Sequence, residues 1–197
     1  MPWRDVAPIV LALPRGGVPV AVEIAAALNA PIDVLIVRKL GSPLQPELAL
    51  GALGERGVVV LNEDLVEAIG VSPDELRRIE EREATEIERR RSRYRGDRAM
   101  VAIDGRVVII VDDGLATGAT ARAAVAVARA LGAARVIVAV PVGAADSLNL
   151  MAGEADDVVA LAAPYHFAAV GAWYDDFRQV GDDEVERMLS TAAGSTG

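Results

Sequence analysis

The chain of 197 residues carries a net charge of −9, and 52% of its residues are hydrophobic. The acidic excess argues against nucleic acid as the main partner, because a phosphate backbone calls for a basic face. With no cysteine and one histidine, the chain excludes a disulfide framework, a thiol nucleophile and a His-rich metal site. No apolar run reaches the ~20 residues of a membrane span, and we find no signal peptide. We therefore expect a cytoplasmic protein without a membrane partner.

The N-terminal part predicts a strand–helix–strand unit of parallel type. An apolar strand over residues 9–13 is followed by a Gly-containing turn at residues 14–17 and a helix over residues 18–28. Asn29 ends this helix because it adopts the left-handed cap conformation readily. A second apolar strand covers residues 33–37 and ends in two basic residues.

The middle of the chain predicts a hairpin and a highly charged helical segment. Residues 49–53 and 58–61 read as the two strands of the hairpin, and a short helix follows at residues 62–68. Ser72 is the N-cap of a long helix, with Pro at the first position and Glu three residues after the cap. Apolar positions in the long helix are sparse, so we expect an inserted, mobile helical segment at about residues 62–100.

From residue 107 onward, strands and helices alternate. The expected strands and helices are, in chain order, residues 107–112, 119–131, 135–140, 144–153 and 158–161. This alternation predicts an α/β fold with a doubly wound, mostly parallel sheet. We expect a single domain over residues 1–197, with a small hood formed by terminal or inserted segments. An aromatic tail covers about residues 163–197 and ends in an amphipathic helix.

Three polar segments directly follow predicted strands: residues 14–17, residues 38–39 and residues 112–120. Ligands of such sheets bind at the carboxyl ends of the strands, so we expect the three segments to share one crevice. The third segment joins two adjacent carboxylates, Asp112 and Asp113, to a small-residue loop and a helix N-terminus. The backbone N–H groups of such a loop bind an anion, whereas the acids suit sugar hydroxyls or a metal ion. The sequence therefore predicts a phosphosugar site.

Residues 107–120 resemble, nearly position for position, the phosphoribosyl pyrophosphate (PRPP) signature of type I phosphoribosyltransferases. That signature is four apolar residues, two acids, two usually apolar residues and a small Thr/Ala/Gly loop. Gly114 departs from it, because an apolar residue is usual there. Leu-Pro-Arg-Gly-Gly-Val-Pro, Val-Arg-Lys-Leu-Gly and Ala-Val-Gly-x-Trp-Tyr-x-x-Phe are similar to a bacterial branch of these enzymes. The signature also looks like that of adenine phosphoribosyltransferase, and Ala116 replaces an Asp of hypoxanthine-guanine enzymes, which disfavours a 6-oxopurine substrate.

The resemblance implies a role for each segment of the crevice. Asp112 and Asp113 bind the ribose hydroxyls and, through those hydroxyls or water, Mg²⁺. The residues implied to bind the 5′-phosphate are Ala116, Thr117, Gly118, Ala119 and Thr120. The residues implied to bind the pyrophosphate are Arg15, Gly16, Gly17, Arg38 and Lys39. The family also carries a loop that closes over PRPP, and here it falls in residues 40–106, so Tyr94 and Arg95 are expected to act as catalytic groups with the two acids.

The nucleobase needs an apolar or aromatic wall, which the family often takes from a segment after the last core strand. Tyr165, His166 and Phe167 are the expected wall, whereas Trp173, Tyr174 and Phe177 are predicted to form a small satellite core.

The implied reaction transfers the phosphoribosyl group from PRPP to a nitrogen of a nucleobase or related heterocycle, with Mg²⁺ as cofactor. A non-enzymatic sensor of PRPP or a nucleotide with the same fold is one alternative, and a phosphosugar hydrolase is another. We expect a homodimer, which is common in the family, and no nucleic-acid partner.

Overall fold

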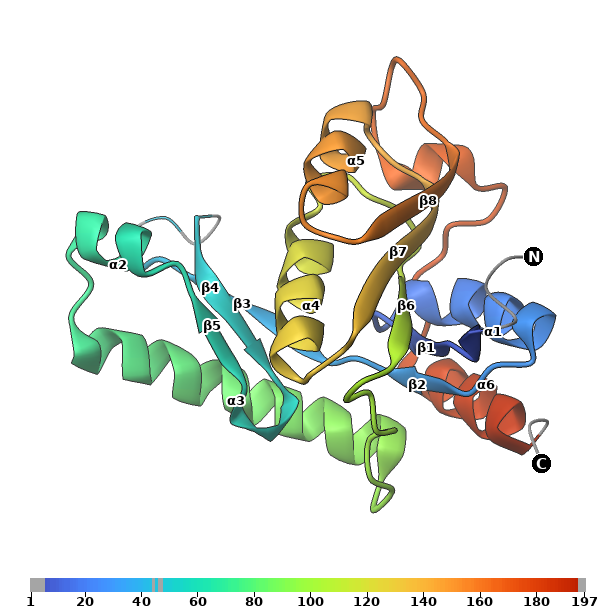
Figure 1. The fold of residues 1–197 in the computed structure, drawn as a ribbon, viewed down its shortest axis with the longest axis horizontal. Helices are drawn as coiled ribbons and strands as arrows, with labels where there is room; N and C mark the ends of the chain where they lie inside the picture. Colours follow the sequence, from blue (N-terminus) through green and yellow to red (C-terminus); the bar gives the residue numbers. More distant parts are fainter. Residues whose placement is uncertain (1–5, 44, 46–47, 195–197) are drawn as a thin grey trace.

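The computed structural model describes residues 6–43, 45 and 48–194 and shows an α/β fold with two sheets (Figure 1). The central sheet has five parallel strands in the order β2-β1-β6-β7-β8. These strands are β1 (Ile9–Ala12), β2 (Ile32–Val34), β6 (Val107–Val111), β7 (Arg135–Val142) and β8 (Asp157–Ala162). The predicted parallel sheet is confirmed, and β1 and β6 lie next to each other near its middle.

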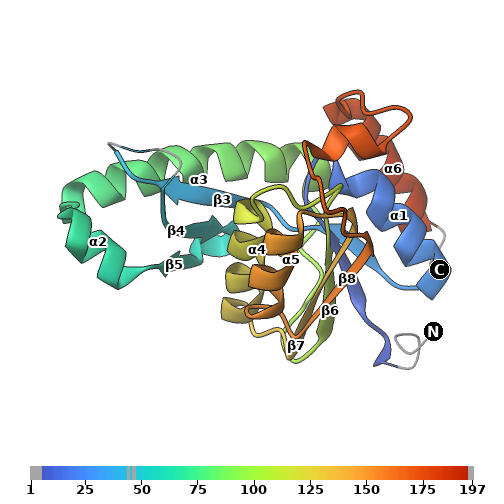
Figure 2. The same ribbon diagram turned by 90° about the horizontal axis from the view of Figure 1, so that it is seen from above.

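Helices cover both faces of the central sheet (Figure 2). They are α1 (Gly17–Leu28), α4 (Ala119–Ala130), α5 (Ala145–Ala152) and α6 (Asp182–Gly194). Leu11 and Ile110 pack into a buried cluster with α4 and α5, whereas Val10 and Ile109 pack into a second cluster with α1 and α6. The strands are thus buried on both faces, which explains their nearly continuous runs of branched apolar residues. Among the described residues, no helix has the length and apolar character needed to cross a lipid bilayer.

A second, antiparallel sheet extends to the left in Figure 1. It consists of β3 (Val37–Gly41), β4 (Ala49–Gly54) and β5 (Val59–Leu61), followed by α2 (Glu63–Ile69) and α3 (Pro73–Arg95). We call β3–β5, α2 and α3 the arm. The predicted hairpin and both predicted helices of this region are present, and Ser72 and Glu75 form the predicted capping box. The predicted mobility of the helical segment stays a prediction.

The predicted second core strand is wrong in its extent. β2 ends at Val34, and the chain passes through Leu35 and Ile36 into the arm. Arg38 and Lys39 therefore lie inside β3 and not at the carboxyl end of a core strand. The break is hidden in the sequence because Leu35 and Ile36 are both fully buried, one in each core cluster.

The end of α3 is fastened to the core by Arg95, which is 5% exposed. Its guanidinium donates to both carboxylate oxygens of Glu55, to Asp33 at 3.1 Å and to the carbonyl oxygen of Val34 at 2.8 Å. Tyr94 is also buried, and its hydroxyl donates to Asp182 at 2.6 Å.

These contacts contradict the expected position of Tyr94 and Arg95 over a reacting diphosphate. The partner acids Glu55 and Asp33 lie 40 and 62 residues away from Arg95 in the chain, so the sequence pattern of the helix end did not show them. Both side chains instead hold the arm against the central sheet.

Replacing Arg95 by Met leaves two buried carboxylates, Asp33 and Glu55, without their cation. We expect the free energy of unfolding to fall by about 3–5 kcal/mol in the Arg95→Met variant, measured by urea denaturation. Arg77→Met, which breaks an exposed pair with Asp74, is the control, with an expected change below ~1 kcal/mol. Equal small losses in the two variants would contradict the bracing role of Arg95.

Candidate functional site: a crevice at the carboxyl end of the central sheet

The turn between β1 and α1 packs directly against the two acids that follow β6. A Cβ atom on Gly16 would lie 1.8 Å from Oδ2 of Asp113, and one on Gly17 would lie 2.9 Å from the Cα of Asp112 and 2.4 Å from the carbonyl oxygen of Val111. Only glycine allows this approach, because real Cβ atoms do not come so close to other heavy atoms. The expected meeting of the Arg15-Gly16-Gly17 turn with the acid pair is therefore present in the structure.

The two carboxylates are half-buried, and no cationic side chain among the described residues pairs with them. Burial raises the pKa of Asp112 to about 7, and the neighbouring charge of Asp113 adds to the shift. Burial also raises the pKa of Asp113 above its usual range. No arginine of the described chain forms an ion pair with either acid. A pair of acids in such surroundings favours a bound cation or hydroxyl donors, since both compensate the cost of burying charge.

The small-residue loop after the acids hydrogen-bonds to β7 and α5 through part of its backbone, whereas other amide groups of the loop have no acceptor among the described residues. The amide of Leu115 donates to the carbonyl oxygen of Val142 at 2.9 Å, and Ser147 of α5 donates to the carbonyl oxygen of Ala116 at 2.5 Å. Gly118 has a φ of 71°, which turns the chain into α4. Within the described residues, the amide N–H groups of Thr117, Gly118 and Thr120 have no acceptor. Such N–H groups at a helix N-terminus form an anion site.

Two adjoining cavities border these elements. One has a volume of about 690 Å³, and its lining includes Arg15, Gly16, Arg90, Asp113, Tyr174 and Phe177. The other has a volume of about 310 Å³ and is lined by Pro14, Val37, Arg38, Lys39, Arg90, Thr120 and Ala123. They share Pro14 and Arg90, and we call them together the crevice. The crevice brings Arg38 and Lys39 to Thr120 of the small-residue loop even though β3 belongs to the arm.

Arginines on the crevice are each held by an acid. Arg38 donates to Glu83 at 2.8 Å, Arg90 donates to Glu86 at 2.7 Å, and Arg15 lies 3.8 Å from Asp182. Sequence reasoning missed Arg90, since nothing distinguishes it within the arginine-rich second half of α3. The helical period was the available signal, because Arg90 lies one turn before Tyr94 on the side of α3 that faces the core.

The tail reaches the crevice through a different group of aromatic residues from the expected one. Tyr174 and Phe177 line the larger cavity, with ring centroids 5.2 Å apart. Tyr165 is 94% exposed and its ring packs only on the edge of His166, so the expected wall of Tyr165, His166 and Phe167 does not line the crevice. The tail passes over Gly114 instead, where the absence of a side chain leaves room for it.

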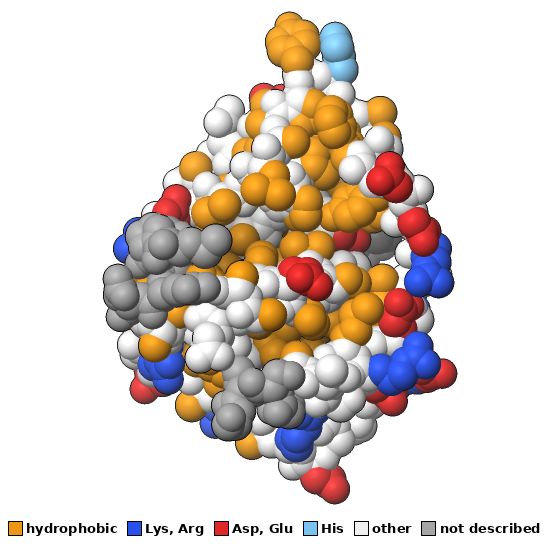
Figure 3. All heavy atoms as spheres, turned by 90° about the vertical axis from the view of Figure 1, so that its right-hand side faces the viewer, with side chains coloured by type: hydrophobic (Ala, Val, Ile, Leu, Met, Phe, Trp, Pro, Cys, Tyr) orange, Lys and Arg blue, Asp and Glu red, His pale blue; other side chains and the backbone are white. Residues whose placement is uncertain are grey.

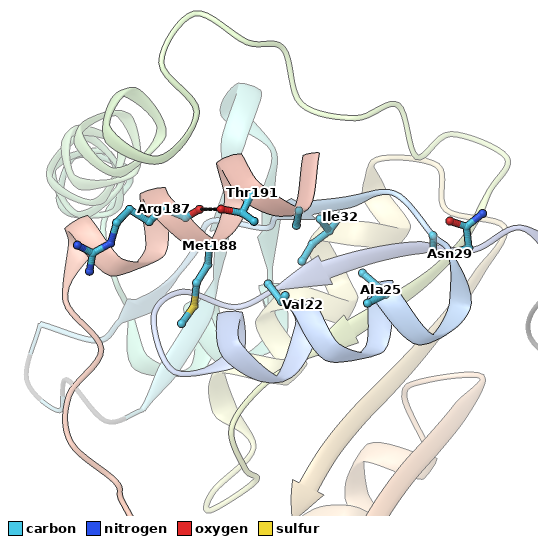
Figure 4. A pocket seen from close by; sticks show the side chains of 10 residues that line it. Val22, Ala25, Asn29, Ile32, Arg187, Met188 and Thr191 are labelled. Atoms are coloured by element: carbon cyan, nitrogen blue, oxygen red, sulfur yellow. Dashed lines mark hydrogen bonds between the residues drawn. The ribbon is translucent and has the colours of Figure 1, made fainter. Parts of the chain in front are cut away.

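A further hollow of about 450 Å³ lies between α1 and α6, away from the acids (Figure 4). Its lining includes Val22, Ala25, Ile32 and Met188, and Arg187 is its one ionisable residue. This lining is mostly apolar and contains no acidic side chain, so the crevice is the better candidate site.

The donor set of the crevice fits Mg²⁺ only with help from a ligand. The described residues contain no group of three or more His, Cys, Asp or Glu side chains suited to hold a metal ion. Mg²⁺ commonly binds through one or two carboxylates together with substrate phosphates and water. Asp112 and Asp113 supply oxygen donors of that kind without a competing arginine.

Comparison with known proteins identifies the family. The family model described as "Phosphoribosyl transferase domain" matches residues 4–159. The chain belongs to this family. The resemblance of residues 107–120 to the family signature is thereby confirmed.

Two curated relatives and one solved structure are similar to most of this chain. "Putative phosphoribosyl transferase Rv0571c" and "Putative phosphoribosyl transferase MT0597" of two Mycobacterium tuberculosis strains are each 53% identical over 184 residues, which cover 93% of this chain. The chain spans 42% of the length of these curated relatives. The crystal structure of TT1426 from Thermus thermophilus has a TM-score of 0.89 and 46% identity, covering 95% of this chain and 89% of that chain.

The raised pKa of Asp112 makes a prediction about the unliganded protein. The folded state holds the Asp112 proton more tightly than the unfolded chain, so this residue costs stability as pH rises from about 4 towards 7. We expect Asp112→Asn to raise Tm by a few °C at pH 8 and by less at pH 5, measured by calorimetry. Asp97→Asn, at an exposed position after α3, is the control. A gain in Tm that does not grow with pH would contradict the raised pKa of Asp112.

Proposed function

We propose that this protein transfers the 5-phosphoribosyl group of PRPP to a ring nitrogen of a nucleobase or related heterocycle and releases pyrophosphate. The observation that carries the proposal is the arrangement around Asp112 and Asp113. A loop with unpaired N–H groups follows the acid pair in the chain, and cationic side chains border both cavities of the crevice. PRPP needs these groups together, because its ribose carries a 5′-phosphate and a 1′-diphosphate.

The chemistry is a displacement at the anomeric carbon. The bond between that carbon and a diphosphate oxygen breaks, a bond to the acceptor nitrogen forms, and both electrons of the broken bond leave with the pyrophosphate. The proton that the acceptor heterocycle loses passes to the pyrophosphate or to water. The ribose carries positive charge in the transition state, so orientation of the sugar and stabilisation of the leaving group supply most of the rate.

Each part of the crevice has a role in that step. The N–H groups of Thr117, Gly118 and Thr120 bind the 5′-phosphate, together with Ala116 and Ala119 of the same loop. The carboxylates of Asp112 and Asp113 accept hydrogen bonds from the ribose hydroxyls and place the anomeric carbon. Binding of hydroxyls favours the charged form of Asp112, so it lowers a pKa that is about 7 without ligand.

The diphosphate lies among the cationic side chains that line the crevice. Arg15, Gly16 and Gly17 approach it from the β1–α1 turn, and Arg38 and Lys39 approach it from β3. Arg90 belongs to this group because it lines both cavities. Charge-assisted hydrogen bonds from arginine strengthen as the leaving group gains charge.

Asp112 and Asp113 would hold Mg²⁺ through the ribose hydroxyls or water. Mg²⁺ supplies charge neutralisation of the diphosphate when it is bound. The acceptor ring lies against Tyr174 and Phe177, which offer aromatic faces at the larger cavity. No acidic residue stands at Ala116, which supports an acceptor other than a 6-oxopurine.

A panel of nucleobases with PRPP and Mg²⁺, followed for pyrophosphate, tests the proposal. We expect release with at least one base, and we expect the Asp112→Asn/Asp113→Asn double variant to lose PRPP affinity by more than about tenfold, because two sugar contacts are lost. Unchanged affinity in the double variant would reject the site. Tight PRPP binding with a negative panel would favour a sensor, and release of free phosphate would favour a phosphosugar hydrolase.

Arg90 and Arg89 form a matched pair for testing the diphosphate side. Both donate to Glu86 and hold its pKa at about 2, but only Arg90 lines the crevice. We expect Arg90→Ala to lower kcat/KM for PRPP roughly 10–100-fold, because one charge-assisted contact to the leaving group is lost. Arg89→Ala should change it less than about twofold. Equal effects of the two variants in steady-state kinetics would contradict the role of Arg90.

We also propose a homodimer. Hydrophobic side chains gather on the face shown in Figure 3, and the edge strand β8 carries Leu161 at 85% exposure and Val159 at 39%. Exposed apolar surface of this kind is usual at subunit interfaces. Light scattering should give twice the mass of the chain, and Leu161→Asp should shift it towards the monomer. A monomeric wild type at micromolar concentration would reject the dimer.

A further inference from the structure

The tail contacts Asp113 of the acid pair and the glycine that follows it. The hydroxyl of Tyr174 donates to the carbonyl oxygen of Asp113 at 2.6 Å. The next residue, Gly114, is packed beneath the tail, since a Cβ atom there would lie 2.6 and 2.8 Å from the two methyl groups of Val170. Val170 begins the short 3-10 helix η3 (Val170–Trp173), which leads directly into Tyr174.

The hydrogen bond from Tyr174 completes a chain through both acids. The amide N–H of Asp113 donates to Oδ1 of Asp112 at 2.9 Å, while the carbonyl oxygen of the same residue accepts from Tyr174. The backbone of Asp113 is thus held on both sides. Burial and the charges of Asp113 and Asp112 raise the pKa of Tyr174 to about 12, so the phenol keeps its proton and remains a donor at neutral pH.

The tail segment makes packing contacts of its own beside Tyr174. The rings of Tyr174 and Phe177 pack against each other with centroids 5.2 Å apart, and a Cβ atom on Gly171 would lie 2.6 Å from the Phe177 ring. These contacts, together with the space that Gly114 leaves for Val170, place the Tyr174 hydroxyl at the Asp113 backbone.

We propose that Tyr174 is a positioning residue that fixes the Asp113 backbone through its hydroxyl and so sets the orientation of both ribose-binding acids. This inference rests on the proposed function, because the acids are the groups that receive the sugar. It assigns the tail a second task beside forming the acceptor wall. The hydrogen bond from Tyr174 to Asp113 then links the acceptor wall to the ribose-binding acids.

Tyr174→Phe tests the proposal, because it removes the hydroxyl and keeps the ring. We expect the Kd of PRPP with Mg²⁺, measured by calorimetry, to rise about tenfold in this variant. We also expect faster hydrogen exchange at residues 112–118 in the unliganded variant. Tyr165→Phe makes the same chemical change at a 94% exposed position and should alter neither quantity.

A steric variant with a rescue gives an independent test. Gly114→Ala should push Val170 away, break the Tyr174 contact and raise the PRPP Kd as Tyr174→Phe does. Gly114→Ala/Val170→Ala removes the clashing methyl groups and should restore the Kd to within about threefold of wild type, as a residual contact with Val142 is only 3.1 Å. If Gly114→Ala raised the Kd only because folding is lost, adding Val170→Ala would not restore the Kd.

The outcomes separate this inference from the proposed function. A wild type that binds no PRPP defeats the proposed function, and exchange at residues 112–118 still decides the positioning role. Unchanged exchange in Tyr174→Phe overturns the inference. A wild-type Kd in Tyr174→Phe also overturns it, even if exchange is faster.

Discussion

The crevice depends on one close packing contact, between the Gly16–Gly17 turn and the acids at the end of β6. β1 and β6 are neighbours in the sheet, and their side chains fill both core clusters, so their carboxyl ends are fixed relative to each other. The turn and the acid pair must then share a space too small for any Cβ atom. The core therefore supplies a rigid frame, and the two half-buried carboxylates are held in place at a cost that a ligand would offset.

The Asp182 carboxylate connects three further segments near the crevice. Asp182, at the start of α6, accepts from the Tyr94 hydroxyl and forms ion pairs with Arg93 at 3.2 Å and Arg15 at 3.8 Å. The hydrogen bond from Tyr94, followed by the arginine charges, keeps the pKa of Asp182 below its usual range. The arm, the tail helix and the β1–α1 turn meet at this side chain. Its position explains how Arg15, Arg90 and Val180, from three distant parts of the chain, come to border one crevice.

The parts of the site that local pattern predicts are those that follow a single strand. The acid pair, the anion loop and the Arg15-Gly16-Gly17 turn each sit at a strand end, and parallel strands bring such ends to one edge. The helix caps at Asn29 and Ser72 were equally local. The break after β2 was not predictable, because the two residues that cross between the sheets are as apolar as a strand interior.

Long-range partners account for the other errors. Arg95 and Arg90 belong to one charged helix, and nothing in their immediate neighbours says that one is buried on Glu55 while the other lines the crevice. The same holds for the tail, where Tyr165 and Tyr174 each lie in a short aromatic stretch of the sequence. Which of the two reaches the acids is decided by the space beside Gly114, a property of a loop far away in the chain.

The buried and half-buried acids of the molecule differ in whether an arginine compensates their charge. Burial alone would raise the pKa of Glu83, but hydrogen bonds from Arg38 and Arg82 hold it below its usual range. Asp33 and Glu55 both form ion pairs with Arg95. Asp112 and Asp113 are the exception among these acids, since burial raises their pKa values with no arginine to oppose it. Among the described residues, these two adjacent acids have no arginine partner, and Asp113 lines a cavity. This contrast marks them as a candidate functional site on physical grounds independent of the signature.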